Sequence, residues 1–365
     1  MSISSSDVCV IGGGVIGLAA AASLRDRGLE VACFERSDPG DGQSAGRTRQ
    51  FRHLHADPDL ITLAVQAREL WLAWEQQFGR TLLGSEGVLR VGATRGELEA
   101  LRAAGVPAAE VDREQARELF AIADLPDGML LFDPLAGAIR AHETVVALTT
   151  YIGTALRRTD VSSIALDGDA VRLETADGAH HSGRCVVCAG AGTDRLVRPL
   201  GLRVHQLRQA HVRLTFRVKS APPRPLPCFS DRTAAGGEVV YALSDLGDRY
   251  AVGLADVFTY PEIEDLAIDL PDAVDVGSQR ERIVAYVRRV LPGLEPEPVD
   301  EVFRLTTTLP DHPDDGFEIS SRGPVVAVAG PNLFKFAPVI GEQLATAATQ
   351  ERVSTAPGTP VAPSQ

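Results

Sequence analysis

The feature that most constrains this chain lies in its first 35 residues, where a short apolar run leads into closely spaced glycines. Residues 8–11 (VCVI) have the composition of a parallel strand buried on both faces. Residues 12–17 (GGGVIG) follow with the spacing G-x-G-x-x-G, and the alanine-rich stretch 18–27 predicts a helix. A second apolar run at 31–34 ends in Glu35. A bare glycine motif is weak evidence, but this order predicts a Rossmann-like βαβ unit.

Each part of this unit has a mechanical role in binding a dinucleotide. Gly12 permits the tight turn, Gly14 lets a pyrophosphate approach the backbone, and Gly17 lets the helix pack against the strand. The helix start offers free N–H groups and a positive dipole end to the phosphates. Glu35 is placed to accept hydrogen bonds from ribose hydroxyls, unless it is a solvated strand end, and Arg36 is a further candidate contact. Glu35 favours an unphosphorylated ribose, which leaves FAD and NAD open.

Composition narrows the class of protein further. The chain has 365 residues, 44% of them hydrophobic, so it can bury a large core in one or two domains. A net charge of −13 argues against a nucleic-acid partner, and no basic amphipathic stretch indicates a membrane surface. Five cysteines fit a reducing cytoplasm. Cys185 and Cys188 form a C-x-x-C pair, but without a second pair they predict buried strand residues and not a metal site.

The segment after the βαβ unit carries a family resemblance. Residues 42–53 (GQSAGRTRQFRH) resemble the G-S-x-x-G-x-T-R-x-x-R-H stretch of the monomeric sarcosine oxidase and glycine oxidase group, within the D-amino acid oxidase superfamily. In that group the stretch runs beside a flavin and its second Arg binds the substrate carboxylate. The resemblance therefore implies FAD contacts at Thr48 and Arg49, with the shifted Ser44 as another, and a substrate contact at Arg52.

The end of the chain resembles the same group. Residues 325–329 (VVAVA) form an apolar run that closes on Gly330, as in the last strand of such FAD domains. Residues 333–342 (LFKFAPVIGE) are similar to the group's G-F-K-F-x-x-x-x-G-E, in which the Lys is the second ligand of the substrate carboxylate. This implies the same role for Lys335. Gly190, after another apolar run, resembles a cofactor-contacting glycine.

The pairing of Arg52 with Lys335 makes physical sense. Two cations from distant parts of the chain can hold one carboxylate by charge-assisted hydrogen bonds and so fix the adjacent C–H over the flavin. Structural alternatives remain open: Arg49 could neutralise a carboxylate or a flavin phosphate, and Arg52 could be an ion-pair partner. Lys335 lies in an apolar run, where an unpaired Lys would be costly.

Three departures from the group change what is expected. Phe303 falls where sarcosine oxidases have the Cys that attaches FAD, so the cofactor should be noncovalent. Ala251 falls where they have a Lys over the flavin, credited with activating oxygen, which makes oxygen use less certain. The loop at 331–333 is shortened. Together these changes favour an N-substituent different from, and larger than, that of sarcosine.

The expected fold is α/β, with a Rossmann-like FAD-binding domain interleaved with an α+β substrate domain built on an antiparallel sheet. Alternating segments at 237–242 and 249–254 predict strands of that sheet. Tyr241 and Tyr250 are candidates for the pocket wall, although Tyr241 could equally be a plain cross-strand aromatic. The expected ranges are 1–84, 140–208 and 305–350 for the FAD domain, 85–139 and 209–304 for the substrate domain, and 351–365 for a flexible tail.

The resemblance implies an FAD-dependent oxidase of N-substituted glycines. A neutral secondary amine would give hydride from its α carbon to the flavin, and hydrolysis of the imine would yield an amine and glyoxylate. Molecular oxygen would take the electrons as hydrogen peroxide. An FAD-dependent amino-acid dehydrogenase with another electron acceptor is one alternative, and an NAD-dependent dehydrogenase is another.

Overall fold

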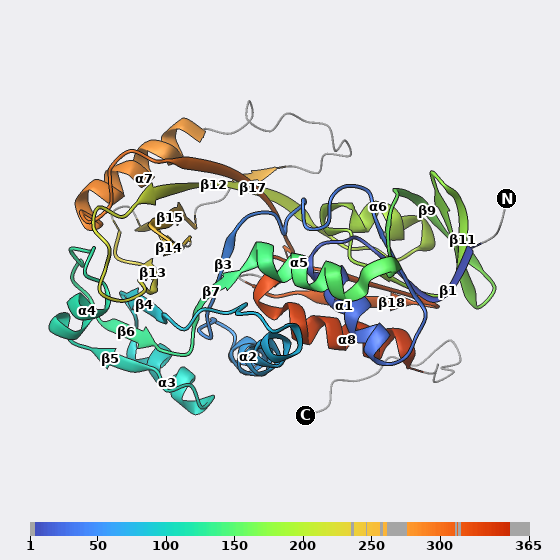
Figure 1. Cartoon of the computed structure of the whole chain (residues 1–365), viewed down its shortest axis with the longest axis horizontal. Coiled ribbons are helices and arrows are strands. Elements are labelled where there is room, and N and C mark those ends of the chain that lie inside the picture. The colour runs from blue at the N-terminus through green and yellow to red at the C-terminus, as the bar shows by residue number, and fades with distance from the viewer. Residues whose placement is uncertain are drawn as a thin grey trace.

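The chain folds around two large sheets that lie side by side along the long axis of the molecule (Figure 1). This computed structural model describes residues 4–234, 237–245, 247–255, 258–260, 276–310, 312 and 315–350. The α/β class expected from the sequence is confirmed, with a mixed sheet that has a parallel centre in one half and a mainly antiparallel sheet in the other.

The first sheet has the order β18-β19-β11-β1-β2-β8, with β10 and β9 extending it beside β11. Its middle strands run parallel, while β18 pairs antiparallel with β19. The strands are β1 (Ser4–Ile11), β2 (Val31–Glu35), β8 (Leu156–Arg158), β9 (Val161–Asp167), β10 (Ala170–Thr175), β11 (Gly178–Val187), β18 (Glu318–Arg322) and β19 (Val325–Ala329). The predicted strands at 8–11, 31–34 and 325–329 are thus confirmed.

Helices cover both faces of this sheet because its strands are apolar on both sides. One face packs against α1 (Val15–Asp26), α5 (Ala141–Ile152) and α8 (Ala337–Thr349) and shares a core with α2 (Pro58–Phe78). The other face carries α6 (Thr193–Val197) and the β9–β10 hairpin. Helices α1 and α8 approach closely at Gly341, where a Cβ atom would lie 2.9 Å from the backbone of Ala19.

The second sheet has the order β16-β12-β15-β14-β13-β4-β6-β5, with β17 on the other side of β12. Helix α7 (Val276–Val290) packs on β12 and β15. Helices α3 (Arg95–Ala103) and α4 (Arg113–Leu119) flank the far strands (Figure 1). The strands are β4 (Val88–Val91), β5 (Ala109–Val111), β6 (Leu130–Asp133), β12 (Leu207–Arg217), β13 (Cys228–Asp231), β14 (Val240–Ser244), β15 (Arg249–Leu254), β16 (Phe258–Tyr260) and β17 (Asp300–Thr308).

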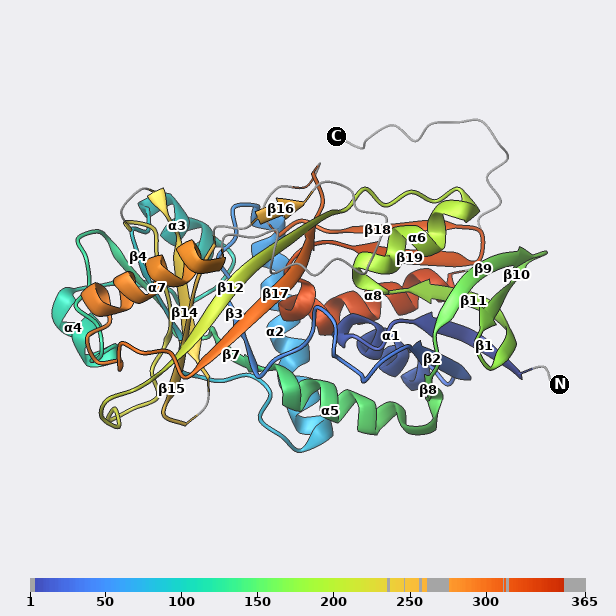
Figure 2. The ribbon, with the colours of Figure 1, turned by 90° about the horizontal axis from the view of Figure 1, so that it is seen from above.

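Two pairs of strands span the region between the two halves. The long strands β12 and β17 run beside one another from the second sheet toward the first (Figure 2). A two-stranded ribbon of β3 (Thr48–Phe51) and β7 (Gly137–Arg140) lies between the sheets (Figure 1). We propose two domains that follow the two sheets. The boundaries expected near residues 208 and 305 then fall inside β12 and β17, which belong wholly to the second sheet.

Candidate active site

The turn after β1 has room for glycine alone at two positions. Gly12 has a φ of +107°, and a Cβ atom there would lie 2.3 Å from the carbonyl oxygen of Cys188. A Cβ atom on Gly17 would lie 1.9 Å from the carbonyl oxygen of Gly12. These contacts press the turn against the end of β11 and set the start of α1 at the carboxyl edge of the sheet, where α/β folds bind their ligands.

The start of α1 fits a dinucleotide pyrophosphate. Gly14 is the N-cap and supplies no side-chain cap, and N–H groups at the start of a helix can bind a phosphate. Ser44 Oγ accepts a hydrogen bond from Val15 N at 3.0 Å, which brings the 42–47 loop over this end. Glu35 Oε2, at the end of β2, accepts one from Gly13 N at 2.6 Å. The expected phosphate and ribose residues are therefore gathered in one place.

Three further residues are candidate contacts of the cofactor. Gly190, with a φ of +56°, follows β11 and faces Gln43 of the 42–47 loop. Gly330 directly follows β19 at the same edge of the sheet. Arg36 is exposed beyond Glu35. We keep all three as proposed cofactor contacts.

Thr48 and Arg49 make internal contacts. The buried Thr48 hydroxyl donates to Asp245 Oδ1 at 2.8 Å. Arg49 donates to the carbonyl oxygens of Gln43 and Ala45, at 3.1 and 2.5 Å, and to that of Thr48, and its guanidinium lies 5.5 Å from the ring centroid of Phe334. Arg49 thus ties the 42–47 loop to the segment that carries Lys335, which positions both.

Arg52 and Lys335 meet at one carboxylate, that of Asp315. Lys335 Nζ lies 3.0 Å from Asp315 Oδ2, and Arg52 Nη2 forms an ion pair with the same oxygen. His55 Nδ1 lies 3.1 Å from it, without the alignment of a hydrogen bond. Asn332 Nδ2 donates to the other oxygen at 2.7 Å. The convergence of the two cations expected from the sequence is present, and the anion between them belongs to the chain itself.

The topology explains this meeting. Strands β18 and β19 pair antiparallel with Glu318 opposite Ala329, so the residues before β18 and after β19 lie side by side. Asp315 comes shortly before β18, and Lys335 lies in the 3-10 turn Leu333–Phe336 shortly after β19. Arg52 follows β3 and donates its Nε–H to the carbonyl oxygen of Leu54 at 3.0 Å. Three separate segments therefore build the cluster.

Burial and charge set the protonation states of the cluster. Lys335 and Arg52 hold the pKa of the Asp315 carboxyl well below its usual range against the opposing effect of burial. Burial, with the nearby Arg52 charge, lowers the pKa of Lys335 to about 8. Burial and the two cations lower the pKa of His55 to about 4, so its imidazole is neutral at pH 7. The cluster carries two positive charges and one negative charge.

The two candidate pocket tyrosines lie on opposite faces of the second sheet. Tyr241 is half-buried opposite Gly253, where a Cβ atom would lie 2.4 Å from the Tyr241 hydroxyl oxygen. It shares the face of Ala251, which packs toward the first sheet. Tyr250 is fully buried on the other face and donates to the carbonyl oxygen of Pro227 at 2.6 Å. The expectation that Tyr250 lines a pocket is wrong, and Tyr241 remains a proposal.

Asp315, His55 and Asn332 belong to the cluster but were not predicted from the sequence. His55 lies two residues beyond His53 and carried no ligand spacing. Asp315 lies in a run of acidic residues and prolines, 309–316, that has the composition of a solvated turn. A usable signal was present nonetheless, because the apolar surroundings of Lys335 require a carboxylate partner.

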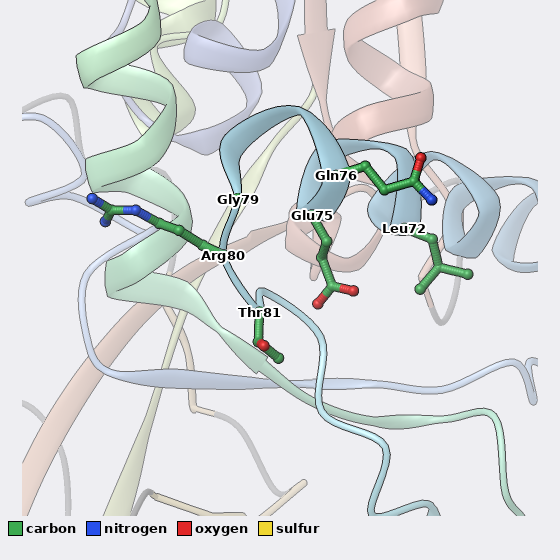
Figure 3. Close-up of a pocket in the computed structure, with 6 residues that line it drawn as sticks. All are labelled: Leu72, Glu75, Gln76, Gly79, Arg80 and Thr81. Carbon is green, nitrogen blue, oxygen red and sulfur yellow. The ribbon is translucent and has the colours of Figure 1, made fainter.

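A surface depression of about 410 Å³ lies elsewhere, at the C-terminal end of α2 (Figure 3). It is lined by Leu72, Glu75, Gln76, Gly79, Arg80 and Thr81. Glu75 accepts hydrogen bonds from Leu82 N and Leu83 N, and Arg80 pairs with Glu143 at 3.3 Å. No residue of the cation cluster or the glycine turn lines it, so it is not a candidate active site.

Comparisons with known proteins agree with this geometry. The chain matches the DAO family, described as FAD dependent oxidoreductase, over residues 7–347. A monomeric sarcosine oxidase of Streptomyces avermitilis is 28% identical over 365 residues, which cover 93% of this chain and 92% of that protein. An N-methyl-L-tryptophan oxidase of Salmonella gallinarum is 24% identical over 92% of both.

Solved structures show the same fold. NikD, an unusual amino acid oxidase essential for nikkomycin biosynthesis, superposes with a TM-score of 0.83 at 25% identity, over 97% of this chain and 96% of NikD. Glycine oxidase from Geobacillus kaustophilus gives 0.75 at 22% identity, over 96% of both chains. Among the described residues, no helix is long and apolar enough to cross a membrane. The family match sets aside the NAD-dependent alternative, and the chain belongs to the DAO family of FAD-dependent oxidoreductases.

Proposed function

We propose that this protein oxidises the CH–NH bond of an N-substituted amino acid with a free carboxylate. The observation that supports this most is the meeting of Arg52 and Lys335 at a single carboxylate oxygen, that of Asp315, because cations arranged in this way are able to hold a carboxylate. Relatives named for sarcosine and N-methyl-L-tryptophan support an N-methyl amino acid as the substrate class.

The residues of the chain would bind the FAD and orient the substrate. The start of α1 and Glu35 would hold FAD by its pyrophosphate and ribose, and Phe303 in β17 offers no sulfur for attachment, so the FAD would be noncovalent. Arg52 would hold the substrate carboxylate, which fixes the α carbon one bond away. FAD, when bound, supplies the redox chemistry by accepting a hydride.

The reaction balances as a two-electron oxidation of a neutral secondary amine. The α hydrogen leaves as a hydride with the electron pair of the C–H bond, which yields a protonated imine. Water cleaves this imine into a protonated amine and an oxo acid, which is glyoxylate for an N-substituted glycine. No protein base is needed for the C–H step if the amine is neutral. With molecular oxygen as the acceptor, the electrons leave as hydrogen peroxide.

One observation favours an electron acceptor other than molecular oxygen. Ala251 is buried and apolar at the position where the resembling group has a Lys. A cation that would stabilise reduced oxygen is therefore missing at that position, and a dehydrogenase that passes electrons to another acceptor is the competing proposal.

The test is anaerobic mixing of the holoenzyme with a panel of N-methyl amino acids, with their methyl esters as controls. Bleaching of the flavin absorbance by the acids supports the proposal, and bleaching by esters alone or by none of the panel contradicts it. Admission of air then separates the two acceptors. Peroxide formation indicates the oxidase, and flavin that stays reduced for minutes indicates the dehydrogenase.

A further inference from the structure

The carboxylate of Asp315 has partners at both of its oxygens. Its Oδ2 contacts Arg52 and Lys335, and its Oδ1 accepts a hydrogen bond from Asn332. The Asp315 side chain is only 3% exposed. Both oxygens therefore already have charged or polar partners.

The two cations differ sharply in access. The Lys335 side chain is 4% exposed, and besides Asp315 its Nζ donates to the carbonyl oxygen of Asn332 at 3.2 Å and lies 5.0 Å from the Phe336 ring centroid. The Arg52 side chain is 34% exposed, although its Nε and Nη2 are engaged. A solute can reach Arg52, whereas Lys335 is enclosed by its partners.

Asp315 is held in place by backbone packing as well as by charge. Gly330, with a φ of +157°, lies so close to Phe317 that a Cβ atom on it would be 2.5 Å from the Phe317 Cβ. Asn332 adopts the left-handed region with a φ of 50°, the single non-glycine residue to do so in the described ranges. This conformation aims its side-chain amide at Asp315. The segment that carries Asp315 is thus pressed onto the turn that carries Lys335.

We propose that Asp315 is a positioning residue that determines specificity by neutralising Lys335, so that a substrate carboxylate is bound by the exposed edge of Arg52 alone. With His55 neutral, the cluster has a net charge of one, and without Asp315 it would have two. A net charge of one matches a single carboxylate and disfavours a second. The inference rests on the proposed function for its substrate class.

Calorimetric titration of the holoenzyme with propanoate and with succinate tests this, because these acids have no amine to oxidise. Asp315→Asn keeps the shape and leaves both cations without an anion. We expect it to bind propanoate at least about tenfold more tightly than wild type and to gain more for succinate. Arg52→Met should lose propanoate binding.

The double variant Asp315→Asn with Lys335→Met removes the internal pair as a neutral unit, and it should bind propanoate within about threefold of wild type. Thermal melting of both variants reports whether they fold. If the unpaired cations of Asp315→Asn destabilise that variant, the double variant still tests the inference. A loss of about thirtyfold or more in the double variant would show that Lys335 contacts the carboxylate and overturn the inference. Unchanged or weaker binding in Asp315→Asn, or no propanoate binding by wild type, would also overturn it. Failure of the proposed function appears separately, as a flavin that no N-methyl amino acid reduces.

Discussion

Replacement of Arg52 is the change that probes substrate recognition most sharply. Arg52→Met removes both the charge and the planar donor fork, while Arg52→Lys keeps the charge and loses the fork. We expect kcat/KM for an N-methyl amino acid to fall strongly in the first variant and less in the second. The matched control is the methyl ester of the same amino acid, which has no carboxylate to bind.

The size of the effect follows from the exposure of the side chain. Arg52 is one-third exposed, so an effective dielectric constant of about 20 applies, and two unit charges 4 Å apart then interact by about 4 kcal/mol. Solvent and the neighbouring Asp315 carboxylate reduce this value. A remaining contribution of about 2–3 kcal/mol corresponds to a loss of roughly 30- to 150-fold in kcat/KM for Arg52→Met.

Stopped-flow reduction of the flavin under anaerobic conditions measures this loss without interference from oxygen. The ester should change by less than about threefold in the same variants, because it never used the Arg52 charge. Equal losses for the acid and the ester would refute the reasoning. Arg52 would then serve only as a structural partner of Asp315 and Leu54.

Three further outcomes are expected. Trichloroacetic acid should release FAD into the supernatant, because Phe303 cannot attach it; flavin in the protein pellet would contradict this. Glu35→Ala should lower the ratio of FAD to protein after gel filtration without loss of secondary structure, because hydrogen bonds to the ribose are lost. Full FAD occupancy in this variant would show that Glu35 is only a solvated strand end. The melting temperature should fall as pH drops from about 6.5 to 4, because the folded-state pKa of His55 is lowered to about 4 and the unfolded chain binds the proton first. His55→Gln should flatten part of that slope, and an identical slope would place the titration elsewhere.

Local patterns were sufficient to predict the glycine turn and several strands of the first sheet. The turn at Gly12 and Gly17 has contacts that exclude any side chain, so the glycine spacing is a direct trace of the backbone packing. The apolar runs of β1, β2 and β19 likewise reflect strands buried on both faces. Each of these elements is formed by residues that are close together in the sequence. Spacing and periodicity therefore reveal them.

The environment of the cation site could not be predicted in the same way. Asp315 reaches Lys335 only because β18 and β19 pair, and that register is not encoded in either segment alone. The face occupied by Tyr250 was also misassigned, because alternation fixes two faces of a strand without saying which sheet each will meet. The partner of the Thr48 hydroxyl, Asp245, also lies in a distant segment and could not be predicted from the local sequence. A cofactor contact at Thr48 stays a proposal.

The central claim is that the flavin takes a hydride from the α carbon of a carboxylate-anchored amine. Single-turnover flavin reduction with two isotopologues of an N-methyl amino acid that reduces the flavin, one deuterated at the α carbon and one at the N-methyl group, tests it most directly. We expect severalfold slower reduction with the α-deuterated compound and an unchanged rate with the N-methyl-deuterated one. The reverse pattern would contradict the claim, because the bond that breaks would then lie on the other side of the nitrogen.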